Sequence, residues 1–289
     1  MCTLVLFRHV HPRWPLVLAA NRDELYARGA TGPTVLRERP RIVGGRDLEK
    51  GGTWMGLTPG GLVVALTNQR TGRAPDRTRR SRGEVVVEAL ACGSVDSAAA
   101  LVAGLDPSEH NAFNLLIADA DRALVAYARD DAASIEIEDV PAGVHVLPND
   151  RLDADGWPKV ERALRSASRV AGSHPPGPLP VGEGGNDGAW AAMVEDLRAM
   201  LADHRTEPPD AVMLALAQER AERPAASWLT PEVVRALDAL CIHTPVYGTR
   251  SATLVALEPG RVAQYLFAEG PPCTTPFRDV RALLEGAAP

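Results

Sequence analysis

The sequence predicts an α+β fold in which two mainly antiparallel β-sheets pack between helices. Two observations carry this prediction: short apolar runs rich in β-branched residues fall in separate blocks, and helical stretches lie between these blocks. Two sheets covered by helices are the natural way to bury so many short apolar strands. We expect the 289 residues to form a single domain, 1–289, which is an ordinary length for a double-sheet sandwich.

The first half of the chain is expected to be rich in strands. The Pro-containing segment 11–15 should join the first two strands as a hairpin, since apolar runs flank it on both sides. Two helices should follow, and Ser94 is a suitable N-cap for the second. The expected strands are 3–10, 16–21, 53–57, 61–67, 113–119, 122–129, 134–139 and 143–148, and the helices are about 82–92 and 95–104.

The second half is expected to be mainly helical until its final hairpin. A segment rich in Pro and Gly, 172–188, is predicted to be a long, flexible loop, either a lid or a variable insertion. The expected helices are 157–171, 189–203, 209–221 and 231–241, and the hairpin strands are 251–258 and 261–267.

Composition excludes several classes of protein. A net charge of −6 argues against general nucleic-acid binding. No apolar run approaches the roughly 18 residues that a membrane span needs, and the N-terminus does not resemble a signal peptide. We therefore expect a cytoplasmic protein whose partner is a small molecule rather than a nucleic acid or a membrane. The sequence leaves the oligomeric state open.

Cys2 is the most informative residue. Once Met1 is removed, Cys2 carries a thiol and a free α-amine on the same residue. An α-amine has a reference pKa of about 7.7–8.0, so it can act as the base for its own thiol nucleophile. The alternative is that a cysteine at position 2 is incidental.

Arg22 and Asp23 are expected to lie beside Cys2, because the first hairpin returns the chain to its start. A guanidinium near a thiol favours the thiolate, and a carboxylate could hold the terminal amine in place. We therefore expect the pKa of Cys2 to lie below the ordinary value. A solvated charged turn is the alternative reading.

These residues and five further segments resemble one known family. Met1-Cys2 together with Asn21-Arg22-Asp23-Glu24 is similar to the NRDE-motif family, known in animals as the transport and Golgi organisation protein 2 family. The further segments span nearly the whole chain in the expected order: Gly52-Thr53-Trp54-Met55-Gly56, Ala65-Leu66-Thr67-Asn68, Phe113-Asn114-Leu115-Leu116, Asn149 with Trp157-Pro158-Lys159, and Tyr247-Gly248-Thr249-Arg250-Ser251.

The resemblance implies a four-layer αββα sandwich of the N-terminal-nucleophile hydrolase type. In layout this is similar to cysteine amidases that cleave bile-salt conjugates, penicillin V and ceramides. For eukaryotic members of the family, haem trafficking and the handling of lipids or acyl-coenzyme A have been suggested. The resemblance thus implies two functions, an amidohydrolase and a carrier.

Three asparagines at strand ends are candidate pocket residues. Asn68 and Asn149 each follow an apolar run, where a side-chain amide can donate to a developing oxyanion. An ordinary Asx turn is the alternative. By resemblance to the cysteine amidases, we assign Asn68 and Asn149 to catalysis and Asn21 to substrate binding.

Arginines are the other candidates. Arg250 could approach Cys2 from the far side of the sheet, as the amidase comparison suggests, or could be a structural anchor. The segment 69–82 holds six arginines and could bind an anion at the cleft or be a solvated loop. We assign Arg250 to catalysis, and Arg70, Arg77 and Trp54 to substrate binding.

The remaining cysteines show no metal-binding spacing. Cys92, Cys241 and Cys273 are far apart and form no C-x-x-C pair, which argues against a zinc ribbon or a covalent haem site. We expect Cys92 and Cys241 to be inert core thiols and Cys273 to be peripheral. No metal site and no cofactor is therefore assigned, although haem is a possible ligand under the carrier hypothesis.

Three functions follow from these residues. The first is a cysteine N-terminal-nucleophile amidohydrolase that cleaves a non-peptide C–N bond of a small, anionic or acylated molecule. The second is a non-catalytic protein that carries haem, lipid or acyl-coenzyme A in the same cleft. The third is a structural or interaction protein in which the motif only stabilises the fold. The hydrolase hypothesis is favoured because it gives Cys2, Arg22, Asp23 and Asn149 each a purpose.

Overall fold

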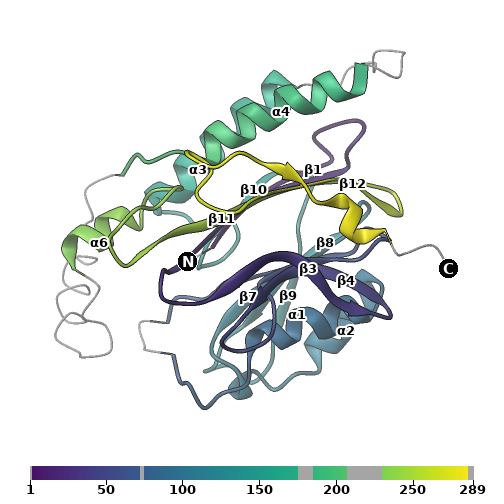
Figure 1. The fold of residues 1–289 in the computed structure, drawn as a ribbon. Helices are drawn as coiled ribbons and strands as arrows, with labels where there is room; N and C mark the ends of the chain where they lie inside the picture. Colours follow the sequence, from purple (N-terminus) through teal and green to yellow (C-terminus); the bar gives the residue numbers. More distant parts are fainter. Residues whose placement is uncertain (1, 72–74, 175–184, 207–229, 286–289) are drawn as a thin grey trace.

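The computed structural model describes residues 2–71, 75–174, 185–206 and 230–285. They form four layers in the order helices, sheet, sheet, helices (Figure 1). All strand pairs in both sheets are antiparallel. The prediction of an α+β sandwich with two mainly antiparallel sheets between helices is confirmed.

Sheet A, the upper sheet in Figure 1, contains both the first and the last of the described strands. The hairpin predicted at 11–15 is present, since the His9 amide donates to the Pro15 carbonyl over 2.7 Å. In spatial order, the strands of sheet A are β10 (Gly143–Leu147), β1 (Thr3–Arg8), β2 (Leu16–Leu25), β11 (Tyr247–Glu258), β12 (Arg261–Ala268) and β13 (Arg278–Asp279).

Sheet B follows the chain order without a crossover. Its strands are β3 (Ala30–Glu38), β4 (Arg41–Asp47), β5 (Met55–Leu57), β6 (Val63–Asn68), β7 (Phe113–Ala118), β8 (Ala123–Ala128) and β9 (Glu136–Asp139).

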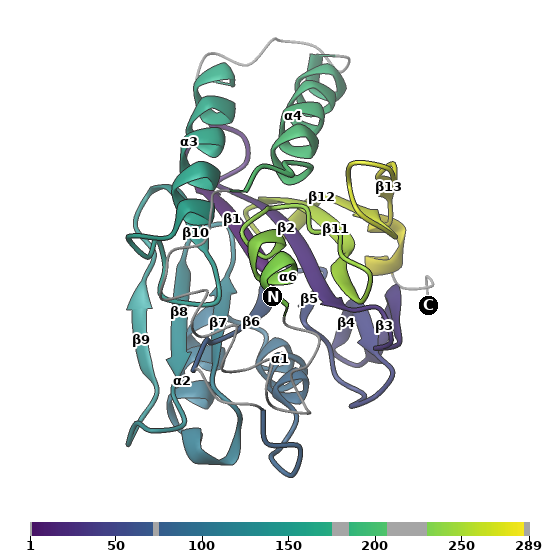
Figure 2. The same ribbon diagram turned by 90° about the vertical axis from the view of Figure 1, so that its left-hand side faces the viewer.

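Helices cover the outer face of each sheet (Figures 1 and 2). Two lie on sheet B, and Ser94 caps the second by accepting from the Ser97 amide, as predicted. Two longer helices lie on sheet A, and a short one precedes β11. The helices are α1 (Arg82–Ala91), α2 (Val95–Ala103), α3 (Pro158–Ser173), α4 (Gly185–Leu201) and α6 (Pro231–Ala236), with short 3-10 turns at Pro107–Glu109 and Arg281–Leu284.

Three apolar cores hold the layers together. One lies between the two sheets and contains Leu4, Leu147 and Tyr265. The others lie between each sheet and its helices. Among the described helices, none is long and apolar enough to cross a membrane.

Several predicted element boundaries were wrong. β3 and β4 were not predicted, because β3 is a half-exposed edge strand that holds Pro33, a residue that strands tolerate mainly at sheet edges. Both ends of the predicted loop 172–188 are helical, and its centre lies outside the described residues. The predicted helix 209–221 also lies outside them, and α6 ends at Ala236 rather than 241.

Candidate active site

Cys2 directly precedes β1, which lies between β2 and β10 in sheet A. Thr3 pairs with Asn21 of β2. Continuing this antiparallel register by one position brings Cys2 opposite Arg22. In Figures 1 and 2 the N-terminus lies at one end of the sandwich, at the level between the two sheets.

The register on the other side brings Cys2 close to Asn149. Leu4 pairs with Leu147 of β10, so two further positions place Cys2 opposite Asn149. Leu4 packs in the core between the sheets. Because side chains alternate along a strand, Cys2 faces the same inter-sheet side. The half-buried thiol is thus flanked by a guanidinium on one neighbouring chain segment and an amide on the other.

Arg22 lies on the inter-sheet face of β2 and is buried, with only 6% of its surface exposed. Its guanidinium carbon lies 4.2 Å from the centroid of the Trp54 ring. Among the described residues, no carboxylate lies within ion-pair distance of Arg22. Burial lowers the pKa of Arg22, whereas negative charge at Cys2 would raise it. Arg22 is therefore suited to stabilise an anion that forms beside Cys2.

The expectation that the Cys2 thiol has a lowered pKa was wrong. With Met1 still in front of it, burial raises the pKa of Cys2, and this effect outweighs the positive N-terminus and Arg22, which act in the opposite direction. The carboxylates of Asp23 and Glu24 raise the pKa further. At neutral pH the thiol therefore keeps its proton, and a nucleophilic Cys2 needs a general base.

Asp23 lies on the opposite face of β2 from Arg22, because consecutive strand residues alternate. Its side chain is fully buried, and Oδ1 accepts a hydrogen bond from Thr249 Oγ1 over 2.7 Å. Lys159 Nζ lies 3.7 Å from Asp23 Oδ2. Asp23 is thus an oriented carboxylate beneath the start of β1.

Lys159 was not assigned by sequence analysis, although it belongs to the Trp157-Pro158-Lys159 segment. Pro158 begins α3 at a position where proline is favoured, and this fixes Lys159 in the first turn. Burial lowers the pKa of Lys159, and the nearby Asp23 raises it. Lys159 is therefore a buried amine at the site and a second candidate base.

Asn68 and Asn149 join the ends of the two sheets. Asn149 Nδ2 donates to the Asn68 carbonyl over 2.6 Å, and the Arg70 amide donates to the Asn149 carbonyl over 2.8 Å. An amide group carries two N–H donors, so this contact with Asn68 fixes the orientation of Asn149 and leaves its other N–H for a ligand.

Asn21, which was assigned to substrate binding, makes buried contacts within the fold. Its Nδ2 donates to the Leu201 carbonyl over 2.9 Å and to the Leu240 carbonyl over 2.8 Å. Both amide hydrogens are therefore used. Asn21 ties β2 to the end of α4 and to the segment before β11.

We expect Asn21→Ala to destabilise the protein by about 2–4 kcal/mol, because the carbonyls of Leu201 and Leu240 lose their donor. The substitution also removes a buried amide oxygen that has no partner among the described residues, and this offsets part of the cost. Urea denaturation would measure the change, and Asn111→Ala, which loses two solvent-exposed hydrogen bonds to the Asp76 backbone, should cost less. A raised KM at unchanged stability would instead favour a substrate-binding role.

Arg250 is an anchor that also faces a cavity. It occupies the register shift of β11, and its guanidinium donates to the carbonyls of Leu25, Tyr26 and Arg28. With Arg22, it lines a cavity of about 230 Å³ whose other walls include Trp54, Phe267 and Glu269. Cys2 is not one of the lining residues, but its neighbour Arg22 is. The contacts of Arg250 are those of a structural anchor. In addition, the guanidiniums of Arg22 and Arg250 line the same cavity.

The arginine segment 69–82 is largely occupied by local contacts. Arg70 stacks on Trp157, with its guanidinium carbon 4.2 Å from the ring centroid. Arg79 pairs with Asp130 and Arg80 with Glu109. Burial lowers the pKa of Arg82 to about 10. Arg77 is exposed, and Arg73 lies outside the described residues.

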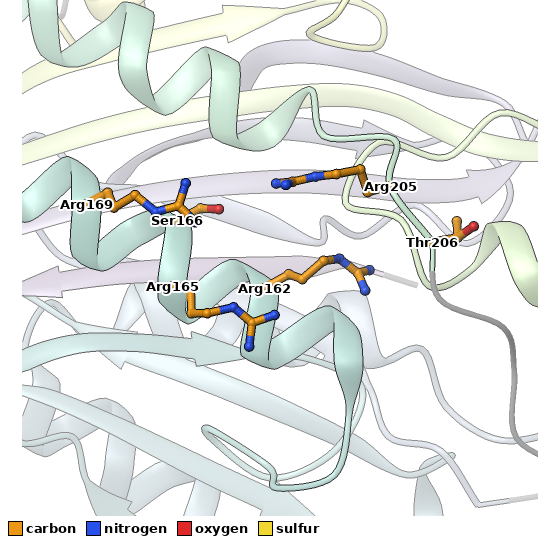
Figure 3. Close-up of a pocket in the computed structure, with 6 residues that line it drawn as sticks. All are labelled: Arg162, Arg165, Ser166, Arg169, Arg205 and Thr206. Atoms are coloured by element: carbon orange, nitrogen blue, oxygen red, sulfur yellow. The ribbon is translucent and has the colours of Figure 1, made fainter.

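A larger cavity, of about 380 Å³, lies on the outer side of sheet A, beside α3 and the segment that follows α4 (Figure 3). Its deepest arginine, Arg162, is paired with Asp238 over 2.7 Å. This cavity lies on the outer side of sheet A, whereas Cys2 faces the other sheet, so we do not assign the cavity to the candidate active site. Its lining residues are Arg162, Arg165, Ser166, Arg169, Arg205 and Thr206.

Comparison with known proteins finds relatives along most of the chain. The sequence model of the family described as Transport and Golgi organisation 2 matches residues 1–268. A Bos taurus protein named Transport and Golgi organization protein 2 homolog is 29% identical over 270 residues, which covers 89% of both chains. The Homo sapiens protein of the same name is 27% identical over 275 residues, again 89% of both chains.

Two solved structures are similar in overall arrangement. A mutant of the conjugated bile acid hydrolase from Clostridium perfringens has a TM-score of 0.49 and 12% identity, covering 99% of this chain and 95% of that chain. The Caenorhabditis elegans ortholog of N-acylethanolamine-hydrolyzing acid amidase has a TM-score of 0.49 and 13% identity, covering 90% and 93%.

Proposed function

The chain belongs to the Transport and Golgi organisation 2 family, and from this premise we propose that it is a cysteine N-terminal-nucleophile amidohydrolase. The bond cleaved is a non-peptide C–N bond of a small molecule that carries an anionic group. The observation that carries this proposal is the position of Cys2 between Arg22 and Asn149 on the inter-sheet face.

The reaction has two halves. Cys2 Sγ forms a bond to the amide carbonyl carbon, and the C–N bond of the resulting tetrahedral intermediate breaks to release the amine and leave a thioester. Water then attacks the thioester, and its C–S bond breaks to release the carboxylic acid and the thiol. In the first half, the base takes the proton of the thiol and then gives it to the leaving amine.

The α-amine of Cys2 is the proposed base. A base is needed because burial raises the pKa of the thiol, so that the thiolate is scarce at neutral pH. An α-amine titrates near pH 8, which matches this task. The buried Asp23 carboxylate, held by Thr249 and close to Lys159, would orient the amine. Removal of Met1 is part of the proposal.

The oxyanion of the tetrahedral intermediate would be stabilised by Asn149 and Arg22. Asn149 is held by its bond to the Asn68 carbonyl, so its remaining N–H needs little reorganisation. Arg22 is buried and stacked on Trp54, which strengthens its interaction with a developing negative charge.

The substrate class is suggested by the cavity that Arg22 and Arg250 share. Its volume of about 230 Å³ suits a small group such as a carboxylate with a short chain rather than a large ring system. Guanidiniums bind carboxylates in a bidentate manner. An amide whose amine portion carries a carboxylate, such as an N-acyl amino acid, fits this description.

We expect the protein to hydrolyse N-acyl amino acids with a kcat/KM at least about tenfold higher than that for the matching N-acyl amines without a carboxylate. Release of the free amine from a panel of such pairs would measure the preference. Arg22→Met should reduce both the rate and the preference, whereas Arg77→Ser on the exposed segment should change neither.

Equal turnover of charged and neutral amides would refute the anionic specificity. No turnover of any amide, together with tight haem or acyl-coenzyme A binding that survives Cys2→Ala, would favour the carrier function over the hydrolase.

A further inference from the structure

Four side chains that could bind a metal meet beside the candidate active site. They come from three segments: the residues after α4, the segment before β11, and the loop between β12 and β13. Each offers one ligand atom, and these atoms all lie within 4.8 Å of one another. The four residues are His204, Cys241, His243 and Cys273.

The three distances among Cys241, His243 and Cys273 match the edges of a tetrahedral metal site. With metal–sulfur bonds of about 2.3 Å and metal–nitrogen bonds of about 2.0–2.1 Å, tetrahedral geometry places two sulfurs about 3.8 Å apart and a sulfur and a nitrogen about 3.6 Å apart. The two sulfurs, Cys241 Sγ and Cys273 Sγ, are 3.7 Å apart. His243 Nε2 lies 3.6 Å from Cys241 Sγ and 3.3 Å from Cys273 Sγ.

The fourth ligand is oriented by a hydrogen bond to the backbone. His204 Nδ1 lies 3.0 Å from the Cys241 carbonyl, which can only accept. This contact fixes the proton on Nδ1 and leaves Nε2 with a free lone pair. Metal-binding histidines commonly donate their other ring N–H to a carbonyl in this way.

The donor set identifies the class of metal. Two thiolates and two imidazoles in tetrahedral geometry are the ligands of structural zinc sites, and two thiolates neutralise the charge of Zn²⁺. Four protein ligands leave no open position for water or substrate. A metal bound here would therefore be structural.

The position of the cluster suggests what the metal would stabilise. Between its two ligands Cys241 and His243, the Ile242 amide donates to Thr249 Oγ1, and Thr249 donates to Asp23 Oδ1. A metal at this point would fix the segment that holds the Asp23 carboxylate.

We propose that His204, Cys241, His243 and Cys273 bind one Zn²⁺, which joins three segments of the chain next to Asp23. Only Cys241 and His243 are close in sequence: His204 lies 37 residues before Cys241, and Cys273 lies 30 residues after His243. A single Cys-x-His pair is too short to reveal such a site, so sequence analysis interpreted Cys241 as an inert core thiol and Cys273 as peripheral.

The test measures metal content in the full chain, without substrate. After reconstitution with Zn²⁺ and removal of the excess, elemental analysis should give about one zinc per chain. Cys273→Ser and His243→Ala should weaken zinc affinity at least about 100-fold, whereas Cys92→Ser, which removes a cysteine outside the cluster, should leave it unchanged. Cys273→His should restore binding, because it supplies a nitrogen donor. A strong chelator should lower the Tm by about 5–10 °C.

Replacement of zinc by Co²⁺ in the unmodified chain tests the site even if a ligand variant fails to fold. Tetrahedral Co²⁺ with thiolate ligands should give intense visible bands and thiolate-to-cobalt charge-transfer absorption. Less than about a tenth of a zinc per chain after reconstitution would overturn the proposal. So would unchanged zinc content in folded Cys273→Ser, or a Cys241–Cys273 disulfide in protein that carries no zinc.

Discussion

Replacing Cys2 by alanine is expected to lower kcat/KM for a hydrolysed amide by about 10⁴–10⁶-fold, because no other group can form the thioester. Alanine is small, so removal of Met1 should proceed as before. The side chain is half-buried at the mouth of the inter-sheet face, and truncation should change the stability little. Amine release under saturating and limiting substrate would measure the effect.

Cys92→Ala is the matched control for this prediction. Cys92 is half-buried at the end of α1 and makes no contact with Cys2, so its loss should leave turnover intact. Cys2→Ala protein that keeps more than about a tenth of the activity would show that Cys2 is not the nucleophile.

Keeping a residue in front of Cys2 is expected to lower turnover at least about 10³-fold. An extra glutamate between Met1 and Cys2 blocks removal of Met1, because methionine aminopeptidase requires a small second residue. The thiol remains, but its nitrogen becomes part of a peptide bond and cannot accept a proton. Since burial raises the pKa of Cys2, the remaining thiolate is scarce.

Intact mass would show which form each preparation contains. An added alanine tests the same point with Met1 removed, because methionine aminopeptidase still acts there but the Cys2 nitrogen stays in a peptide bond. Turnover of the alanine-extended protein should therefore fall as well. Full activity of the glutamate-extended protein would rule out the α-amine as the base. Lys159, the other buried amine at Asp23, would then be the candidate, and Lys159→Met should abolish that activity.

Local sequence patterns predicted the layers and the approach of Arg22 to the start of the chain. Alternating apolar residues and a Pro-containing turn are enough to define the β1–β2 hairpin, and its register then determines what lies opposite Cys2. That Arg22 and Asp23 face opposite sides could also have been deduced, since they are neighbours in a strand that extends to Leu25 rather than ending at 21.

Other features depended on tertiary contacts that no local pattern contains. The carbonyls that occupy Asn21 come from residues 180 and 219 positions away. Burial of Cys2 in the folded chain reverses the expected direction of its pKa shift. The four ligands of the proposed zinc site meet only because the ends of three separate elements converge.

The position of β1 between β2 and β10 also bears on the order of events during synthesis. β2 is available almost at once, but β10 begins at Gly143, so at a rate of about 5–20 residues per second the N-terminal strand waits roughly 7–30 s for its second neighbour. β11, the other neighbour of β2, emerges later still. Throughout that interval the first residues remain accessible at the ribosome surface. We therefore expect methionine aminopeptidase to remove Met1 before the long-range pairing closes sheet A. If the aminopeptidase were slower than this interval, the chain would fold with Met1 still attached and its Cys2 amine permanently blocked.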